Sequence, residues 1–343
     1  MDSKKILIIV CSVLAAVTII FGALTVTNFI KSNDAYDGIT ELDADGNPVN
    51  GSSAVKVSPI KVEGEIEYNA AAKQLAAVQS NSYKAEDFKN IKISEDLKQA
   101  YSINNNLVGW LTIPGTEIDT AILQGKDNDY YLKYDFYERY TTETTGTNYG
   151  NLYLDYRCSN TDDLSKNMVI HGHTTGRASG VPKQAFRSLY EYKDMNHFIE
   201  NPIIKYQTLN GEYTYKICAV FLSTTQKADD NGYMFNYIYP DMSDSNMVGY
   251  IEQVQQRMLY ETGVSLEPTD KIITLSTCIY DYGKNVDTRL VVVGRLLHEG
   301  ESEEIDASLV KDNPDYRRPQ VWYNSKGIAN PYKNTEAWKP SAN

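Results

Sequence analysis

The chain has 343 residues, enough for one large domain or two domains of ordinary size. Its formal net charge is -12 at pH 7 and its pI is about 4.9, and no basic cluster alternates with aromatic residues. This charge pattern argues against a nucleic-acid-binding protein.

The N-terminus has the pattern of an uncleaved membrane anchor. Residues 6–30 carry no charged side chain, and about 20 apolar residues already span a hydrocarbon core of ~30 Å. The Ala-x-Ala spacing of a cleavage site is missing before the polar stretch. Lys4 and Lys5 predict that residues 1–5 stay in the cytoplasm and that everything beyond the anchor lies outside the cell. No second apolar stretch of that length follows, so we expect a single-pass protein.

Three further regions are expected after the anchor. Residues 31–85 are predicted to be an extracellular spacer, since the first part is rich in Asp, Gly, Ser and Asn without an apolar period. A helical pattern from about 66 to 104 predicts a helix or helix pair on the outside of the following domain. The main folded domain is predicted to cover residues 86–300. Residues 301–343 show no clear period and form a tail whose order the sequence does not predict.

Most of the central region is predicted to form short strands. The eight expected strands cover residues 107–116, 119–125, 151–157, 167–173, 202–209, 212–224, 271–278 and 289–297. Asn210-Gly211 is a strong two-residue hairpin signal, because both residues tolerate a positive φ. Helices are expected at 185–201 and at 244–263, the second ending at Gly263. Many short strands with few helices predict a closed β-barrel.

Cys278 is the cysteine whose position points to chemistry. Of the four cysteines, Cys11 lies in the predicted anchor, and the remaining three leave at least one thiol free in an oxidising compartment. Cys218 sits in the middle of a strand, whereas Cys278 ends a strand on its more polar face. Strand ends that border loops are favoured positions for catalytic groups. A small core hydrophobe is the ordinary alternative for a lone cysteine.

A nucleophilic thiol needs a base and a group that stabilises negative charge. His173 lies at the strand-to-loop edge of NMVIHGHTTG, where it can reach a cleft. Arg289 opens the next strand after Cys278, so pairing of these two strands would bring its guanidinium to the thiol. A fixed cation there stabilises a thiolate or an oxyanion. Taken alone, a strand-end histidine and a strand-starting arginine are also ordinary structural features.

Three short runs together resemble the sortase family, the cysteine transpeptidases of Gram-positive cell surfaces. They are TLSTC at 274–278, which matches the family pattern TLxTC, IHGH at 170–173, and RLVVVGRL from Arg289. The segments at 104–136 and 150–157 point to class B, and the resemblance covers roughly residues 86–297. It implies a mostly β fold with a few helices, namely a closed eight-stranded sortase-type β-barrel preceded by the transmembrane helix.

The resemblance also implies roles for single residues. Cys278 would be the nucleophile, His173 the acid and base, and Arg289 the oxyanion stabiliser and substrate clamp. Ser276 and Thr277, inside the motif, are predicted to bind substrate. No metal and no cofactor is implied.

Other kinds of protein fit less well. A zinc site from His171, His173 and one distant cysteine lacks the paired ligand spacing that zinc sites usually have. Papain-like enzymes place cysteine first and histidine far downstream, the reverse of the order here. A non-enzymatic surface protein on the same barrel leaves the joint presence of the motifs to coincidence.

The implied reaction is acyl transfer on the outer face of a Gram-positive type cell membrane. Cys278 would cleave a C-terminal sorting signal of secreted proteins, with an Asn-Pro-x-Thr-like signal suggested by the resemblance. The acceptor would be an amine of a peptidoglycan precursor or, in a pilus-assembling class B sortase, a pilin lysine. Specificity is expected to lie in the connection at residues 222–270. Because ordinary thiols and imidazoles are mostly neutral at pH 7, we expect a slow enzyme with a bell-shaped pH profile.

Overall fold

The computed structural model describes residues 95–141, 150–161, 163–175, 184–209, 211–225, 234–283, 286–335 and 337–340. The predicted anchor and spacer, at residues 6–30 and 31–85, lie outside the described residues. Within the part that is described, no helix is both long enough and apolar enough to cross a membrane.

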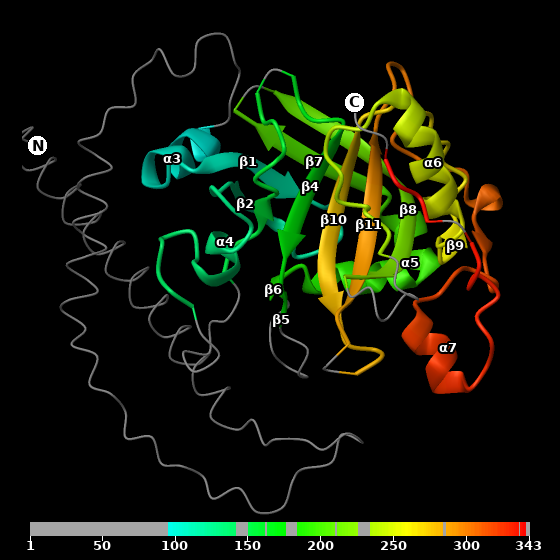
Figure 1. Cartoon of the computed structure of the whole chain (residues 1–343). Coiled ribbons are helices and arrows are strands. Elements are labelled where there is room, and N and C mark those ends of the chain that lie inside the picture. The colour runs from blue at the N-terminus through cyan, green and yellow to red at the C-terminus, as the bar shows by residue number, and fades with distance from the viewer. Residues whose placement is uncertain are drawn as a thin grey trace, which may run out of the picture. The chain divides into compact units, whose positions relative to one another are not determined.

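A closed barrel dominates the described part of the chain (Figure 1). Its eight strands are β1 (Leu107–Thr112), β2 (Asp119–Leu123), β3 (Tyr153–Leu154), β4 (Asn167–Gly172), β7 (Ile203–Thr208), β8 (Glu212–Thr224), β10 (Ile272–Ile279) and β11 (Thr288–Leu296). They are hydrogen-bonded in the order β1-β2-β3-β4-β10-β11-β8-β7, and β7 pairs back to β1. The pairs β2–β3 and β4–β10 are parallel, and the other pairs are antiparallel. The predicted eight-stranded barrel is therefore confirmed.

Short helices and two small strand pairs complete the described fold. The helices are α3 (Glu95–Ile103), α4 (Tyr130–Lys133), the 3₁₀ helix η2 (Arg187–Lys193), α5 (Met195–Glu200), α6 (Asp244–Gln255), the 3₁₀ helix η4 (Ala307–Leu309) and α7 (Gln320–Lys326). The small pairs join β5 (Thr174–Thr175) to β6 (Gln184–Ala185), and β9 (Tyr260–Glu261) to β12 (Lys311–Asp312).

Strands β8, β10 and β11 are buried on both faces, which explains their nearly continuous apolar sequences. Leu275 and Val292 belong to the main core cluster, to which most of the barrel strands contribute. Val291 and Val293 point to the opposite face and join a second cluster with Met247 of α6. Helix α6 therefore covers the outer face of these strands, and Figure 1 shows it beside β8 and β11.

Two predicted elements are interrupted in the structure. The helix expected at 185–201 is divided at Asp194, which ends η2 and whose carboxylate caps α5. The strand expected at 151–157 keeps only β3, because the chain turns at Asp155, whose carbonyl accepts a hydrogen bond from the Cys158 amide at 2.9 Å. Both interruptions are local, a side-chain cap and a turn, and the apolar pattern of the sequence did not reveal them.

The end of α6 was also predicted wrongly. The helix ends at Gln255 instead of continuing to Gly263. The Leu259 amide donates to the Val220 carbonyl at 2.8 Å, which draws the chain out of the helix and towards β8. The next two residues of the chain form β9, so Gly263 lies beyond this strand and is not a helix stop.

The hairpin between β7 and β8 agrees with the sequence. The strands pair up to Gln207 and Glu212, and the Thr208 amide donates to the Gly211 carbonyl at 2.8 Å. A two-residue turn centred on Asn210-Gly211 would pair Leu209 with Glu212, so the hairpin is where the sequence predicted it but its register is not the predicted one.

Candidate active site

Strand register brings the three predicted catalytic residues to one end of the barrel. Cys278 on β10 lies directly opposite Arg289 on β11 in the antiparallel pair. On the other side of β10, Thr277 pairs with Gly172 of the parallel strand β4. His173 follows Gly172 directly after the end of β4, and Cys278 follows Thr277 within β10, so the two residues take equivalent places along this parallel pair.

Gly172 is required by close packing between the two histidines of the IHGH motif. A Cβ atom built on it would lie 2.2 Å from Leu152 Cδ2 and 2.8 Å from Phe186 Cδ2. Any larger residue would therefore push β4 away from its neighbours. The glycine fixes the backbone position from which His173 projects.

The His173 ring is anchored through one nitrogen. Its Nε2 atom lies 2.9 Å from the carbonyl oxygen of Leu132, and a carbonyl only accepts hydrogen bonds, so Nε2 carries the proton. Burial lowers the pKa of His173; the Leu132 carbonyl opposes this shift and the positive charge of Arg289 adds to it. The neutral ring is therefore favoured, with Nδ1 as its basic nitrogen.

Arg289 is held as a cation next to the thiol. Its Nη1 atom donates to the Asp287 carboxylate and, at 3.2 Å, to the Thr288 carbonyl. Burial alone would lower the pKa of Arg289, but its electrostatic interactions with Cys278, Tyr237 and Asp287 raise it above its ordinary value. The side chain is 21% exposed, so the positive charge is only partly screened by water.

Ser276 and Thr277 are buried and hydrogen-bonded inside the protein. The Thr277 hydroxyl lies 2.8 Å from the Gly172 carbonyl and 2.6 Å from the Thr174 hydroxyl, which also contacts the Cys278 carbonyl at 2.7 Å. These contacts tie β10 to β4 directly beside the thiol. The structure accordingly gives Thr277 a positioning role, and substrate binding by Ser276 or Thr277 stays a prediction.

Two tyrosines near the site were not found from the sequence. The Tyr237 hydroxyl lies 2.9 Å from Ser276 Oγ, and the Tyr237 side chain is within electrostatic range of Arg289 and Cys278. Tyr153 on β3 is also within range of both charges, and its pKa is raised mainly by burial. Tyr153 lies in the GNLYLDYR run, which could have identified it, but no local pattern distinguishes Tyr237 from the other scattered tyrosines.

His171 belongs to a separate polar cluster. Its Nε2 atom lies 3.1 Å from Asp155 Oδ2, and the fully buried carboxylate of Asp155 accepts two hydrogen bonds from Arg157 at 2.8 and 2.7 Å. Burial would raise the pKa of Asp155, but hydrogen bonds from Arg157 and His171 hold it well below its ordinary range. His171, which contacts Asp155, is therefore distinct from His173, which lies at the end of β4 near Cys278.

The three described cysteines are free thiols in different surroundings. Cys158 and Cys218 are buried, and burial raises the pKa of each to about 12. Cys278 is more accessible than either. Across the described ranges, no group of three or more His, Cys, Asp or Glu residues is arranged to hold a metal ion.

Comparisons with known proteins agree with this geometry. The Sortase domain family model matches residues 111–297. Sortase B of Listeria monocytogenes is 35% identical over 213 residues, which cover 61% of this chain and 76% of that protein. Sortase B of Staphylococcus aureus is 26% identical over 196 residues, covering 57% of this chain and 72% of that protein.

A solved structure shares the fold. The 2.0 Å crystal structure of Staphylococcus aureus sortase B superposes with a TM-score of 0.50 at 23% identity, covering 68% of this chain and 98% of that chain. At this identity the likeness concerns the fold alone, which in this chain is the closed eight-stranded barrel.

Proposed function

This chain belongs to the sortase family, as a class B cysteine transpeptidase, and we propose that it attaches secreted proteins to the cell wall through a thioester on Cys278. The donor would be a C-terminal sorting signal, Asn-Pro-x-Thr-like. The acceptor would be an amine of a peptidoglycan precursor. The observation that carries the proposal is the strand register, which pairs Cys278 with Arg289 and places His173 directly after the end of the neighbouring strand β4.

The first half of the reaction forms the thioester. The Cys278 sulfur, as thiolate, attacks the scissile carbonyl carbon, and the resulting oxyanion is stabilised by the Arg289 guanidinium. The carbon–nitrogen bond then breaks as the His173 imidazolium gives its proton to the leaving amine. Because Nε2–H is committed to the Leu132 carbonyl, Nδ1 is the nitrogen that exchanges this proton.

The second half transfers the acyl group. The acceptor amine attacks the thioester carbonyl and loses a proton to Nδ1 of His173, and the sulfur leaves as a thiolate. The product is a new amide bond, and thiolate and imidazolium are both restored. No external oxidant, reductant or metal ion is needed to balance either half.

We further propose that residues 6–30 anchor the enzyme in the cell membrane, with the catalytic domain outside. The support is the uncharged run in the sequence and the flanking lysines, Lys4 and Lys5. This location would place the barrel where newly secreted proteins and cell-wall precursors meet.

The test is a transpeptidation assay with the full-length protein. A panel of sorting-signal peptides is incubated with short amines that represent a peptidoglycan cross-bridge, and with a peptide that presents a pilin-type lysine. We expect a new amide product with an Asn-Pro-x-Thr-like peptide and a cross-bridge amine. A product with the lysine peptide alone would favour pilus assembly. The absence of cleavage and of any amide product with every peptide would contradict the proposal.

A further inference from the structure

The described residues beyond 300 lie outside the Sortase domain match, yet they pack along the connection between β8 and β10. Strand β12 pairs with β9, and the Arg317 amide donates to the Gln256 carbonyl at 2.6 Å, just after α6. Figure 1 shows the last described residues, in red, running beside α6. We propose that residues 301–335 and 337–340 form a C-terminal strap that fixes this connection, and that Trp338 is its positioning residue. The inference rests on the proposed function, because the connection is the expected specificity element.

Trp338 joins α6 to the segment that precedes it. Its ring centroid lies 5.8 Å from that of Phe235 and 6.0 Å from that of Tyr250, with edge-to-face angles of 73° and 69°. Phe235 and Tyr250 are themselves buried and 5.5 Å apart. Aromatic rings in this arrangement attract one another beyond the area they bury. The indole thus holds the helix and the 235 segment in one cluster.

Gly249 shows that this helix face is shaped for the indole. A Cβ atom built on Gly249 would lie 2.4 Å from Trp338 Cδ1 and 2.6 Å from Trp338 Nε1. Glycine inside a helix is less stable than alanine, because it loses more backbone entropy on folding. Its presence in α6 is therefore explained by the close approach of Trp338.

The aromatic cluster leads towards the catalytic strand. The Phe235 ring lies 6.3 Å from the Tyr237 ring, and the Tyr237 hydroxyl contacts Ser276, two residues before Cys278. Tyr237 is also within electrostatic range of Arg289. A change in the packing of Trp338 on α6 would therefore shift Tyr237, which lies near Arg289 at the edge of the active site.

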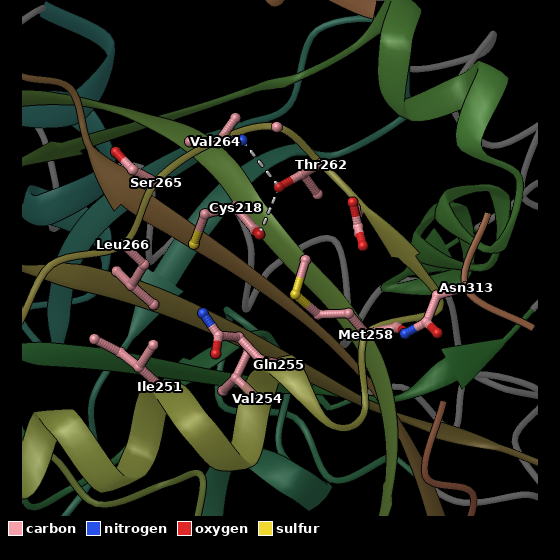
Figure 2. A pocket seen from close by; sticks show the side chains of 12 residues that line it. Cys218, Ile251, Val254, Gln255, Met258, Thr262, Val264, Ser265, Leu266 and Asn313 are labelled. Atoms are coloured by element: carbon pink, nitrogen blue, oxygen red, sulfur yellow. Dashed lines mark hydrogen bonds between the residues drawn. The ribbon is translucent and has the colours of Figure 1, made fainter. Parts of the chain in front are cut away.

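The strap also closes the other side of α6. A cavity of about 400 Å³ lies between α6, β8 and residues 262–266, and Asn313 of the strap lines it. Figure 2 shows Asn313 at the side of this cavity, which the sulfur atoms of Cys218 and Met258 face. The Asn313 side-chain amide donates to the Met258 carbonyl at 2.8 Å. The strap thus holds both the helix and the chain that leaves it.

Trp338→Ala in the full-length protein tests the inference. We expect amide hydrogen exchange over residues 235–256 to become faster by on the order of tenfold, with no change in β1 and β2. For the reactive sorting-signal peptide, kcat/KM should fall roughly threefold to tenfold, the size of effect that the loss of one aromatic cluster contact gives. Alkylation of Cys278 by iodoacetamide, which needs no peptide groove, should keep the wild-type rate. Trp338→Phe should restore most of both losses.

Trp322→Ala is the matched control, because this second tryptophan of the strap packs on Arg318 and Tyr323 within the strap itself. It should leave exchange over residues 235–256 and the peptide kinetics unchanged. Equal exchange in Trp338→Ala and wild type would overturn the inference whatever the activity. So would unchanged peptide kinetics in an active enzyme. Inactivity of the wild type towards every peptide would instead refute the proposed function, and the exchange result would still decide the inference.

In a double-mutant cycle, Gly249→Ala should change Tm in opposite directions with and without Trp338. In the Trp338→Ala background the new methyl group has room, so Gly249→Ala should raise Tm by roughly 1–4 °C. In the wild type the same methyl group displaces the indole, so Tm should fall and exchange over residues 235–256 should rise. The same stabilisation in both backgrounds would mean that Trp338 does not seat on the helix.

Discussion

The Asp155→Asn variant should show that His171, the first histidine of the IHGH motif, has a structural role and that His173, the second, is the catalytic one. The Asp155 carboxylate is fully buried and accepts hydrogen bonds from Arg157 at 2.8 and 2.7 Å, from Asn128 at 2.8 Å and from His171 at 3.1 Å. Asparagine keeps the shape but turns one acceptor into a donor that faces other donors. Breaking a buried ion pair costs about 3–5 kcal/mol, but Arg157 is 35% exposed and recovers part of its hydration. We therefore expect a loss of about 2–3 kcal/mol at pH 7.

The pH dependence of this loss has a definite sign. The pKa of Asp155 is held below its ordinary value in the folded protein, so its stabilising effect is complete above the unfolded-state pKa of about 3.9 and decreases as the pH falls below it. At pH 3 the wild type should have lost about 1.3 kcal/mol of the advantage that it has over the asparagine variant at pH 7.

Urea unfolding of both proteins at pH 7 and pH 3 measures these differences, and the transpeptidation assay measures activity. We expect the variant to keep a kcat within about tenfold of the wild type, since Asp155 contacts His171 and not His173. A stability change below about 0.5 kcal/mol would refute the reasoning about the buried carboxylate. Unchanged stability with a loss of about 10⁴-fold in kcat would make Asp155 and His171 the catalytic pair.

Three further predictions concern the site, the connection and the anchor. Burial and the Arg289 charge lower the pKa of His173, so the acid limb of the kcat/KM profile should lie below pH ~6.5, and an acid limb above pH ~7 would contradict this assignment. Exchanging residues 225–265 for those of a relative should change peptide preference while Cys278 keeps its rate of alkylation; a chimera with the original preference would show that specificity lies elsewhere. Deleting residues 1–30 should release a soluble, active enzyme from the membrane fraction, and loss of activity in that form would mean that the segment does more than anchor.

Much of the barrel could be predicted because its signals are local. The continuous apolar runs of β8, β10 and β11 reflect burial on both faces, and the Asn-Gly signal marks the β7–β8 connection although it does not give the register of the two strands. The positions of Cys278 and Arg289 on adjacent strands follow from the short loop between them. Antiparallel pairing of these two strands is then enough to place Cys278 opposite Arg289.

The remaining features depend on contacts between distant segments. Helix α6 stops early because the chain after it pairs with β8, which the sequence near Gly263 does not reveal. The residues after 300 show no apolar period because a few individual contacts attach them to the rest of the domain. Glu301 accepts a hydrogen bond from the buried Arg295 side chain, and Trp338 packs into an aromatic cluster. Tyr237 enters the site through a long connection, so no spacing rule relates it to Cys278.

The most direct test of the account is to trap and map the acyl-enzyme. The full-length protein is mixed with the reactive sorting-signal peptide without an acceptor amine, quenched in acid and digested for mass spectrometry. We expect one thioester adduct, on the peptide that contains Cys278, which disappears in Cys278→Ala and persists in Cys218→Ala. An adduct on Cys158 or Cys218, or an adduct that survives Cys278→Ala, would contradict the assignment of Cys278 as the nucleophile.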